Sequence, residues 1–302
     1  MLRTSRWKVI AIRYASWIAG GVFVAALVLL FLHLSANDME FSRYNTGWNG
    51  ASAFFFDLDR DKTTDVFYPA VLEKQQGNAT LLIIAPHRKP TENEIAGYRA
   101  FLAQGHTIFL ADDFGSGNEI LAGIGSRVTI IPVNVSSLDR QYADPYLIIT
   151  YRTPEQGPFV MPSEIILNGA ALLGGGTPLA LTSVMSWADR NGNNRLNIGE
   201  EMGTLPVMVQ ESIGPGRLVV LSDPSIFVNT MYIQPENENN RVFIHNLTNN
   251  GPLLIDQMNS RTADAKGLSG ILHVVRNTVI IEILIFSLLI LGAAWAWRKK
   301  AV

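Results

Sequence analysis

The sequence has no cysteine among its 302 residues and only five histidines. Without cysteine there is no disulfide, no thiol nucleophile and no thiolate metal site. No two histidines stand at the spacing of metal ligands, so the sequence does not indicate a histidine zinc site. A Walker loop, a Gly-x-Gly-x-x-Gly fingerprint and a Gly-x-Ser-x-Gly turn are also missing. Because no nucleophile, base and orienting group come together, the sequence does not predict an enzyme.

Near each end of the chain there is a long apolar run with at most one charged residue. Tyr14–Leu34 contains none, and Val279–Trp297 contains only Glu282. Both runs are long enough to cross a bilayer as helices. Seven Lys and Arg residues flank the runs on their terminal sides, which predicts that both termini are cytoplasmic. The sequence therefore predicts a two-pass protein of the cell membrane, with its main domain outside the cytoplasm.

This prediction divides the chain into five parts. They are a cytoplasmic N-terminus (1–13), a transmembrane helix (14–34), an extracytoplasmic domain (35–277), a second transmembrane helix (278–297) and a cytoplasmic tail (298–302). The part between the spans carries 17 Lys and Arg against 25 Asp and Glu, a net charge near −8. Such an acidic domain is not expected to bind nucleic acid.

The clearest pattern in this domain is a strand, a helix and a second strand. Leu81–Pro86 (LLIIAP) is a continuous apolar run, typical of a strand buried on both faces. Thr91 and Glu94 form the pattern of a capping box, which predicts the start of a helix. Thr107–Ala111 (TIFLA) is the next buried strand. A unit of this length is expected to be a parallel crossover.

Further strands are predicted at Val128–Val133, Asp144–Thr150 and Leu179–Ser183, and Leu205–Gln210 and Arg217–Ser222 are predicted to form a hairpin. Gly251–Asn277 is expected to connect the domain to the second span. Together these elements predict an α/β fold, a doubly wound and mostly parallel sheet of the flavodoxin-like type, flanked by the two transmembrane helices.

Polar turns follow two of the predicted strands. Ligands bind at the carboxyl ends of the strands in open parallel sheets, so these turns are the natural position for a site. The candidate ligand-binding residues are Asp112, Asp113, Gly117, Asn118, Ser222 and Asp223. The alternative is structural: the aspartates cap helices, and the glycines allow tight turns.

A third stretch, Asp189–Glu200, has the spacing of a calcium-binding loop. Carboxylate, amide and main-chain oxygens stand where such a loop places its ligands, and Leu196 stands at the position of its inward apolar residue. The predicted metal ligands are Asp189, Asn191, Asn193, Arg195 and Glu200. The position usually held by glycine is Asn194, and asparagine tolerates positive φ better than most residues. The sequence predicts a structural calcium ion of weak affinity, on the order of 10⁻⁴–10⁻³ M; the alternative is a polar surface turn.

Several of these segments, taken together, resemble a known family. LLIIAP, PTENEIAGYRAFLAQGHTIFLADDFGSGNEIL, GRLVVLSDPSIFVNTMY and NNRVFIHNL occur in the order seen in the class I glutamine-amidotransferase-like fold. More narrowly, the chain resembles an archaeal and bacterial membrane-anchored branch, domain-of-unknown-function family 4350. Its relatives include extracytoplasmic domains of gliding-type transport auxiliaries and an intraflagellar-transport domain. The family's amidotransferases need a cysteine nucleophile, which this chain lacks.

The resemblance implies a non-enzymatic ligand-binding or scaffolding module in an envelope assembly or maturation system, with a MoxR-type ATPase and transglutaminase-like partners. The expected ligand is a small molecule, a glycan or a partner protein. The alternative function is a cysteine-independent, metal-assisted hydrolase that uses Asp112, Asp113 and Asp223.

Overall fold

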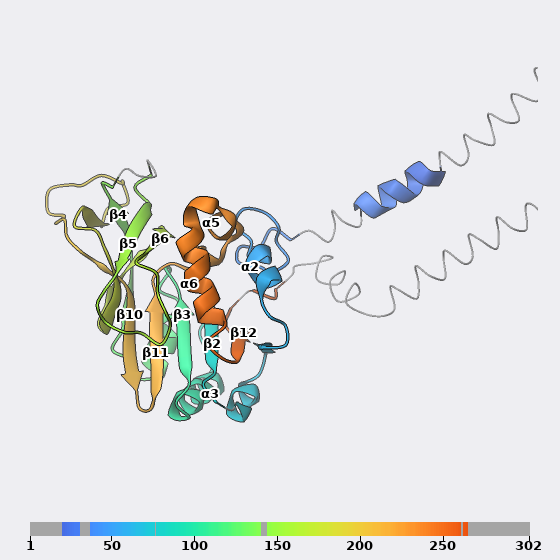
Figure 1. Cartoon of the computed structure of the whole chain (residues 1–302), viewed down its shortest axis with the longest axis horizontal. Coiled ribbons are helices and arrows are strands. Elements are labelled where there is room, and N and C mark those ends of the chain that lie inside the picture. Colours follow the sequence, from blue (N-terminus) through green and yellow to red (C-terminus); the bar gives the residue numbers. More distant parts are fainter. Residues whose placement is uncertain (1–19, 31–36, 76, 140–143, 261, 265–302) are drawn as a thin grey trace, which may run out of the picture. The chain divides into compact units, whose positions relative to one another are not determined.

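The computed structural model describes residues 20–30, 37–75, 77–139, 144–260 and 262–264 (Figure 1). The chain separates into two compact units, one made of Met1–Asn37 with Asp264–Val302 and the other of Asp38–Ala263. The first unit contains a helix over residues 20–30. Every element named below belongs to the second unit.

The second unit has three short α-helices, two longer ones (α3 and α6), three 3₁₀ helices and twelve strands among the residues described. The helices are α2 (Ser52–Asp57), α3 (Glu92–Ala103), α4 (Asn118–Gly123), α5 (Asn229–Ile233), α6 (Glu238–Thr248), η1 (Pro69–Lys74), η3 (Pro224–Phe227) and η4 (Pro235–Asn237). The strands are β1 (Thr63–Val66), β2 (Thr80–Ile84), β3 (Thr107–Ala111), β4 (Thr129–Ser137), β5 (Leu147–Arg152), β6 (Glu164–Asn168), β7 (Ala171–Gly174), β8 (Thr177–Thr182), β9 (Ser186–Asp189), β10 (Pro206–Ile213), β11 (Gly216–Leu221) and β12 (Leu253–Asp256).

Nine strands form one mixed sheet in the order β1-β12-β2-β3-β11-β10-β8-β5-β6 (Figure 1). From β1 to β11 the neighbouring strands are parallel, and from β11 to β6 they are antiparallel. A second sheet has the order β7-β4-β9 and is antiparallel. The large sheet is therefore built of a parallel half and an antiparallel half.

The strand–helix–strand prediction is confirmed. β2 and β3 are parallel neighbours, and α3 between them begins with the expected capping box. The Thr91 hydroxyl accepts a hydrogen bond from the Glu94 N–H, and the Glu94 carboxylate accepts one from the Thr91 N–H. These bonds satisfy two of the backbone donors that a helix leaves free at its start.

Two apolar layers cover the large sheet. One face packs against α2, α5 and α6, with residues such as Phe54, Met231 and Phe243 in the core. The other face packs against α3, α4 and part of the small sheet, with Tyr98, Ile120 and Leu173. Alternate residues of each central strand therefore enter different layers, and the strands are buried on both faces.

The predicted fold class is wrong, because the sheet is mixed, half of it is antiparallel, and a second sheet is present. A continuous apolar run shows that a strand is covered on both faces, and such cover usually comes from the helices of parallel crossovers. Here the small sheet supplies part of that cover, so antiparallel strands such as Val207–Val209 are as buried as parallel ones. The β10–β11 hairpin was predicted, and its two-residue turn makes this pair antiparallel.

A second correction concerns the membrane. No helix is long and apolar enough to cross a bilayer within the part of the chain that the structure describes. The described part of Tyr14–Leu34 is the helix over residues 20–30, and Val279–Trp297 lies outside the described residues. The prediction of a two-pass membrane protein, with cytoplasmic termini and an extracytoplasmic domain, is corrected by this finding. Crossing a bilayer needs about 20 residues of apolar helix, and the described helix over residues 20–30 is shorter than that.

A third correction concerns Gly251–Asn277, which was expected to be a connection. Its first residues form β12, which lies between β1 and β2 in the parallel half. All four residues of β12 are buried. The run Leu253–Asp256 is too short to show a period, so only its pairing identifies it as a central strand.

Candidate functional site

The carboxyl ends of β3 and β11 lie side by side. These strands are parallel neighbours, and Ala111 pairs with Leu221 at their last positions. The Asp112 N–H continues the ladder by donating to the Leu221 carbonyl at 3.0 Å. The two polar turns predicted from the sequence therefore meet at one edge of the sheet, as parallel topology requires.

Asp112 holds the first of these turns together. It is fully buried, and its Oδ1 accepts a hydrogen bond from the Phe114 N–H at 3.0 Å while its Oδ2 accepts one from the Gly117 N–H at 2.7 Å. Burial raises the pKa of this carboxyl, and the backbone donors act against that shift. A Cβ on Gly117 would lie 2.9 Å from a methyl of Leu110, so a larger residue here would require the Leu110 side chain to shift. The contacts of Asp112 and Gly117 within this turn give both residues a structural role.

Asn118 joins α4 to the small sheet. Its Oδ1 accepts from the Ile130 N–H and its Nδ2 donates to the Ile130 carbonyl, both at 2.8 Å. One amide therefore satisfies both backbone groups of a β4 residue. The Asn118 amide, which we predicted to bind a ligand, is therefore already hydrogen-bonded within the fold.

Asp223 is fully buried in the second turn. Its Oδ1 accepts from the Ser225 N–H at 2.7 Å, which caps η3, and its Oδ2 accepts from the Asn168 N–H at 2.6 Å. Burial raises its pKa to about 6 in spite of these donors. Ser222 beside it is also fully buried, and its hydroxyl has no hydrogen-bond partner among the described residues.

Asp113 differs from both neighbouring aspartates. It is half-buried, and its Oδ1 is shielded from solvent without a hydrogen-bond partner in the described part of the chain. Burial, followed by the charges of Asp223 and Asp112, raises its pKa to about 8. At pH 7 this carboxyl is mostly protonated, so it can donate a hydrogen bond as well as accept one. Unlike the carboxyls of Asp112 and Asp223, it has an oxygen that accepts no hydrogen bond from the described residues.

Strained backbone lies at the same edge. Ala85 follows β2 directly and has φ 43°, and its N–H donates to the Ala111 carbonyl at the end of β3. Phe41 has φ 57° and follows Glu40, whose charge contributes to the raised pKa of Asp113. Non-glycine residues seldom adopt this region, and such strain often accompanies binding sites.

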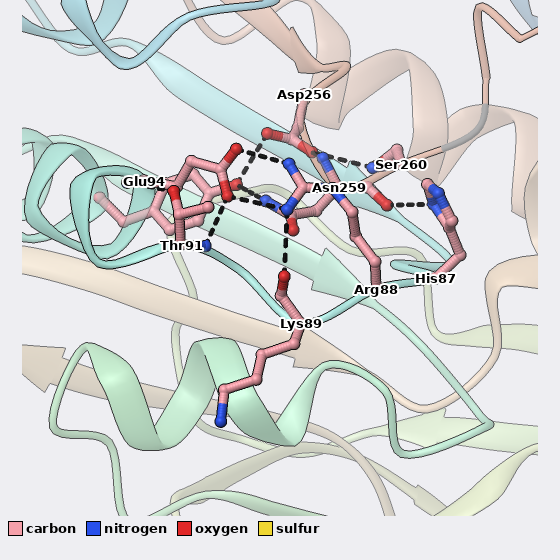
Figure 2. A network of polar contacts seen from close by, with 9 residues as sticks. His87, Arg88, Lys89, Thr91, Glu94, Asp256, Asn259 and Ser260 are labelled. Carbon is pink, nitrogen blue, oxygen red and sulfur yellow. Dashed lines mark hydrogen bonds and ion pairs between the residues drawn. The ribbon is translucent and has the colours of Figure 1, made fainter.

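The sequence did not point to a third fully buried aspartate, Asp256, at the end of β12 (Figure 2). It accepts hydrogen bonds from the Tyr98 hydroxyl at 2.8 Å and from the N–H groups of Asn259 and Ser260 at 2.8 and 3.0 Å. Burial raises the pKa of Asp256, and it raises that of Tyr98 well above the usual value. The one sequence signal was an aspartate directly after the short apolar run.

Around Asp256, the loop after β2 is tied to the loop after β12 and to α3. The His87 Nδ1 lies 2.6 Å from the Asn259 carbonyl oxygen, and Arg88 forms an ion pair with Glu94 (Figure 2). The Asn259 amide donates to the Tyr98 hydroxyl at 2.8 Å. These contacts connect the loop after β12 to the loop after β2 and to α3, both of which lie far from it in sequence, and they link the parallel half through polar groups.

The calcium-type loop closes on Asp189. The Asp189 carboxylate accepts hydrogen bonds from the N–H groups of Gly192, Asn193 and Asn194 at 2.7–3.2 Å. Asn194 has φ 56°, which confirms that asparagine takes the place of glycine at the sharp turn. Leu196 is 39 % exposed, so its prediction as an inward residue is wrong.

The remaining predicted ligands line the same loop. The Asn191 and Asn193 side-chain oxygens accept from the N–H groups two residues further on, Asn193 and Arg195, at 3.1 and 2.9 Å. Glu200 accepts from the Arg190 N–H and the Asn197 N–H, both at 2.9 Å. Carboxylate, amide and main-chain oxygens suit calcium. Among the described residues, no three His, Cys, Asp or Glu side chains are grouped as metal ligands. A calcium ion in this loop would therefore need the amide oxygens of Asn191 and Asn193 besides the carboxylates.

Residues 43–248 match the sequence profile of the domain of unknown function DUF4350. The match covers more than half of the chain, which therefore belongs to this family. No curated protein matches the sequence.

Three solved structures show distant likeness. The "mmIFT52 N-terminal domain" is 14 % identical with a TM-score of 0.41, over 56 % of this chain and 76 % of that one. β-Galactosidases from Bacillus circulans sp. alkalophilus and Halorubrum lacusprofundi are 14 % and 13 % identical, with TM-scores of 0.33 and 0.31 over 54 % and 55 % of this chain. The chain covers only 22 % of each β-galactosidase. Likenesses this low carry no functional argument.

Proposed function

We propose that the chain is a non-enzymatic binding module, with its ligand site at the carboxyl ends of β3 and β11. The observation that carries this proposal is the Asp113 carboxyl, whose buried Oδ1 has no hydrogen-bond partner among the described residues. A buried polar atom without a partner costs about 1–3 kcal/mol, which a ligand donor would recover. The ligand is a small molecule, a glycan or a segment of a partner protein that offers a hydrogen-bond donor.

The alternative is a metal-assisted hydrolase that uses Asp112, Asp113 and Asp223. Each carboxylate oxygen of Asp112 and Asp223 already accepts a backbone N–H. These bonds hold both groups within the turns that they cap, whereas a catalytic metal needs ligands with open coordination positions. The geometry therefore favours binding through Asp113 over catalysis by the three carboxylates.

Comparison of the wild-type chain with Asp113→Leu tests the proposal. Leucine has a branched side chain close in size to aspartate but no oxygen that could accept a hydrogen bond from the ligand. A panel of glycans, amines and small polar metabolites is screened by thermal shift against the full chain. We expect a compound that stabilises the wild type and has no effect on Asp113→Leu. Equal stabilisation of both proteins by every active compound would exclude this site.

We further propose that Asp189–Glu200 holds a structural calcium ion. The observation that favours it is the positive φ of Asn194. This is the backbone conformation that calcium-binding loops need at their sharp turn, where glycine is usual. The ion would tie the long segment between β9 and β10 into a single conformation. It would have no part in the ligand site at Asp113.

A further inference from the structure

A groove that the sequence did not indicate runs between α2, α5 and α6. It consists of two hollows, of about 460 and 540 Å³, which share Asp57, Tyr232 and Arg241. The first hollow lies between α2 and α5, and the second lies between α2 and α6. We name them together the α2–α5–α6 groove.

Asn229 fixes the walls of this groove. Its Oδ1 accepts from the Ala53 N–H at 2.9 Å, at the start of α2, and its Nδ2 donates to the carbonyls of Gly47 and Asn45 at 2.7 and 3.2 Å. The Asn229 side chain is buried at the start of α5, so this one amide holds α2 and α5 together. A groove with fixed walls loses little entropy when a partner binds.

Large apolar side chains stand open to solvent on the rim. Phe56 on α2 is 82 % exposed, Ile233 on α5 is 59 % exposed and Val242 on α6 is 44 % exposed. By contrast, Phe54 on the same helix is fully buried against Phe227, with 4.9 Å between ring centroids. The core therefore does not need Phe56, and apolar residues that gather around a groove mark a contact surface.

The charge of the groove is acidic. Asp57 and Glu238 line it against a single Arg241, whose guanidinium lies 3.9 Å from the Asp57 carboxylate and 5.7 Å from the Tyr232 ring centre. Asp57 keeps 44 % of its side chain exposed. Residues 38–263 as a whole carry 24 Asp and Glu against 15 Lys and Arg. A positively charged partner is attracted to such a surface, and a negatively charged one is repelled.

We propose that the α2–α5–α6 groove binds an amphipathic segment of a partner protein, with apolar side chains on one face and Lys or Arg beside them. The apolar side chains fill the two hollows and contact Phe56, Ile233 and Val242. A basic side chain binds Asp57, which stands between the hollows, and Glu238 attracts a second one. This surface is separate from the Asp113 site, and its proposal does not depend on that site.

The test uses the full chain and two synthetic amphipathic helical peptides with identical leucine positions. One peptide has lysine at its polar positions and the other has glutamate. Binding is measured by fluorescence anisotropy for the wild type, Phe56→Ser and Asp57→Asn, with Phe67→Ser and Asp61→Asn as matched controls. Phe67 is 53 % exposed and outside the groove, and Asp61 is an exposed acid outside it.

We expect the lysine peptide to bind the wild type at least about tenfold more tightly than the glutamate peptide, and each groove variant to lose about tenfold in affinity. The controls should bind as the wild type does. Equal binding of the two peptides, or an equal loss in Phe67→Ser or Asp61→Asn, overturns the proposal. It is also overturned if the full chain sediments as a dimer that Phe56→Ser dissociates, since the groove then belongs to a second copy. Thermal melting confirms that each variant is folded.

Discussion

The side-chain amide of Asn240 binds both backbone groups of Ile166. Its Oδ1 accepts from the Ile166 N–H and its Nδ2 donates to the Ile166 carbonyl, both at 2.8 Å. Ile166 lies in β6, the edge strand of the nine-stranded sheet, and Asn240 lies in α6. The next outward N–H of this edge, that of Asn168, is bound by Asp223. Side chains thus occupy an edge that could otherwise pair with another chain.

Asn240→Ala should therefore destabilise the fold and expose the edge. Two buried backbone groups would lose their partners, at a cost of about 1–3 kcal/mol. Urea unfolding measures the change, and Asn239→Ala is the matched control, since Asn239 is the preceding residue of the same helix and is only half-buried. An unfolding midpoint equal to that of the control would show that the amide pair contributes nothing.

Asp113 should make the folded state less stable as pH rises. Its pKa is raised to about 8 in the fold, so the folded state holds a proton that the unfolded chain releases above its ordinary value. The stabilisation is complete below the unfolded pKa and is lost progressively up to about pH 8. Asp113→Asn keeps a neutral group at every pH, so it should exceed the wild type in stability at pH 8.5 by about 1–3 kcal/mol.

Denaturant unfolding at pH 5 and pH 8.5 measures this difference. The exposed Asp61→Asn is the control, because it removes one carboxylate without touching the site. If Asp113→Asn and the wild type lose the same stability between the two pH values, Asp113 is charged in the fold and the proposed neutral form is wrong.

The calcium-type loop should bind terbium with a luminescence signal. Trp187 lies two residues before Asp189 on the same face of β9, so its indole can transfer excitation to a bound ion. Millimolar calcium should displace terbium and raise the melting temperature. Glu200→Gln should weaken both effects, whereas Glu201→Gln, an exposed acid outside the ligand set, should not. Luminescence that is unchanged in Glu200→Gln would place terbium elsewhere.

The Tyr98 hydroxyl should stabilise the parallel half through Asp256. Tyr98→Phe removes one donor from a fully buried carboxyl and one acceptor from the Asn259 amide. We expect a loss of about 1–3 kcal/mol, measured by urea unfolding. Tyr68→Phe is the control, since Tyr68 is 72 % exposed. A loss no larger than that of the control would mean that water replaces the hydroxyl.

Local patterns in the sequence predicted the elements whose signals are local. The apolar runs at β2 and β3, the Thr91–Glu94 capping box and the β10–β11 turn each depend on residues within one element or one turn. The same reasoning brought Asp113 and Asp223 to one sheet edge, because the carboxyl ends of parallel neighbours must meet. The positive φ of Asn194 followed from the residue type that its loop position requires.

Tertiary structure alone decided the fold class and the state of each polar side chain. A strand that is buried on both faces has the same apolar sequence pattern whether its neighbours are parallel or antiparallel. The mixed sheet and the position of β12 therefore depend on pairing between distant residues. Asp112, Asp113 and Asp223 are alike in sequence, yet only Asp113 keeps an oxygen without a donor among the described residues. That difference arises because the donors come from Gly117, Asn168 and Ser225, which the fold brings to two of the aspartates and not to the third.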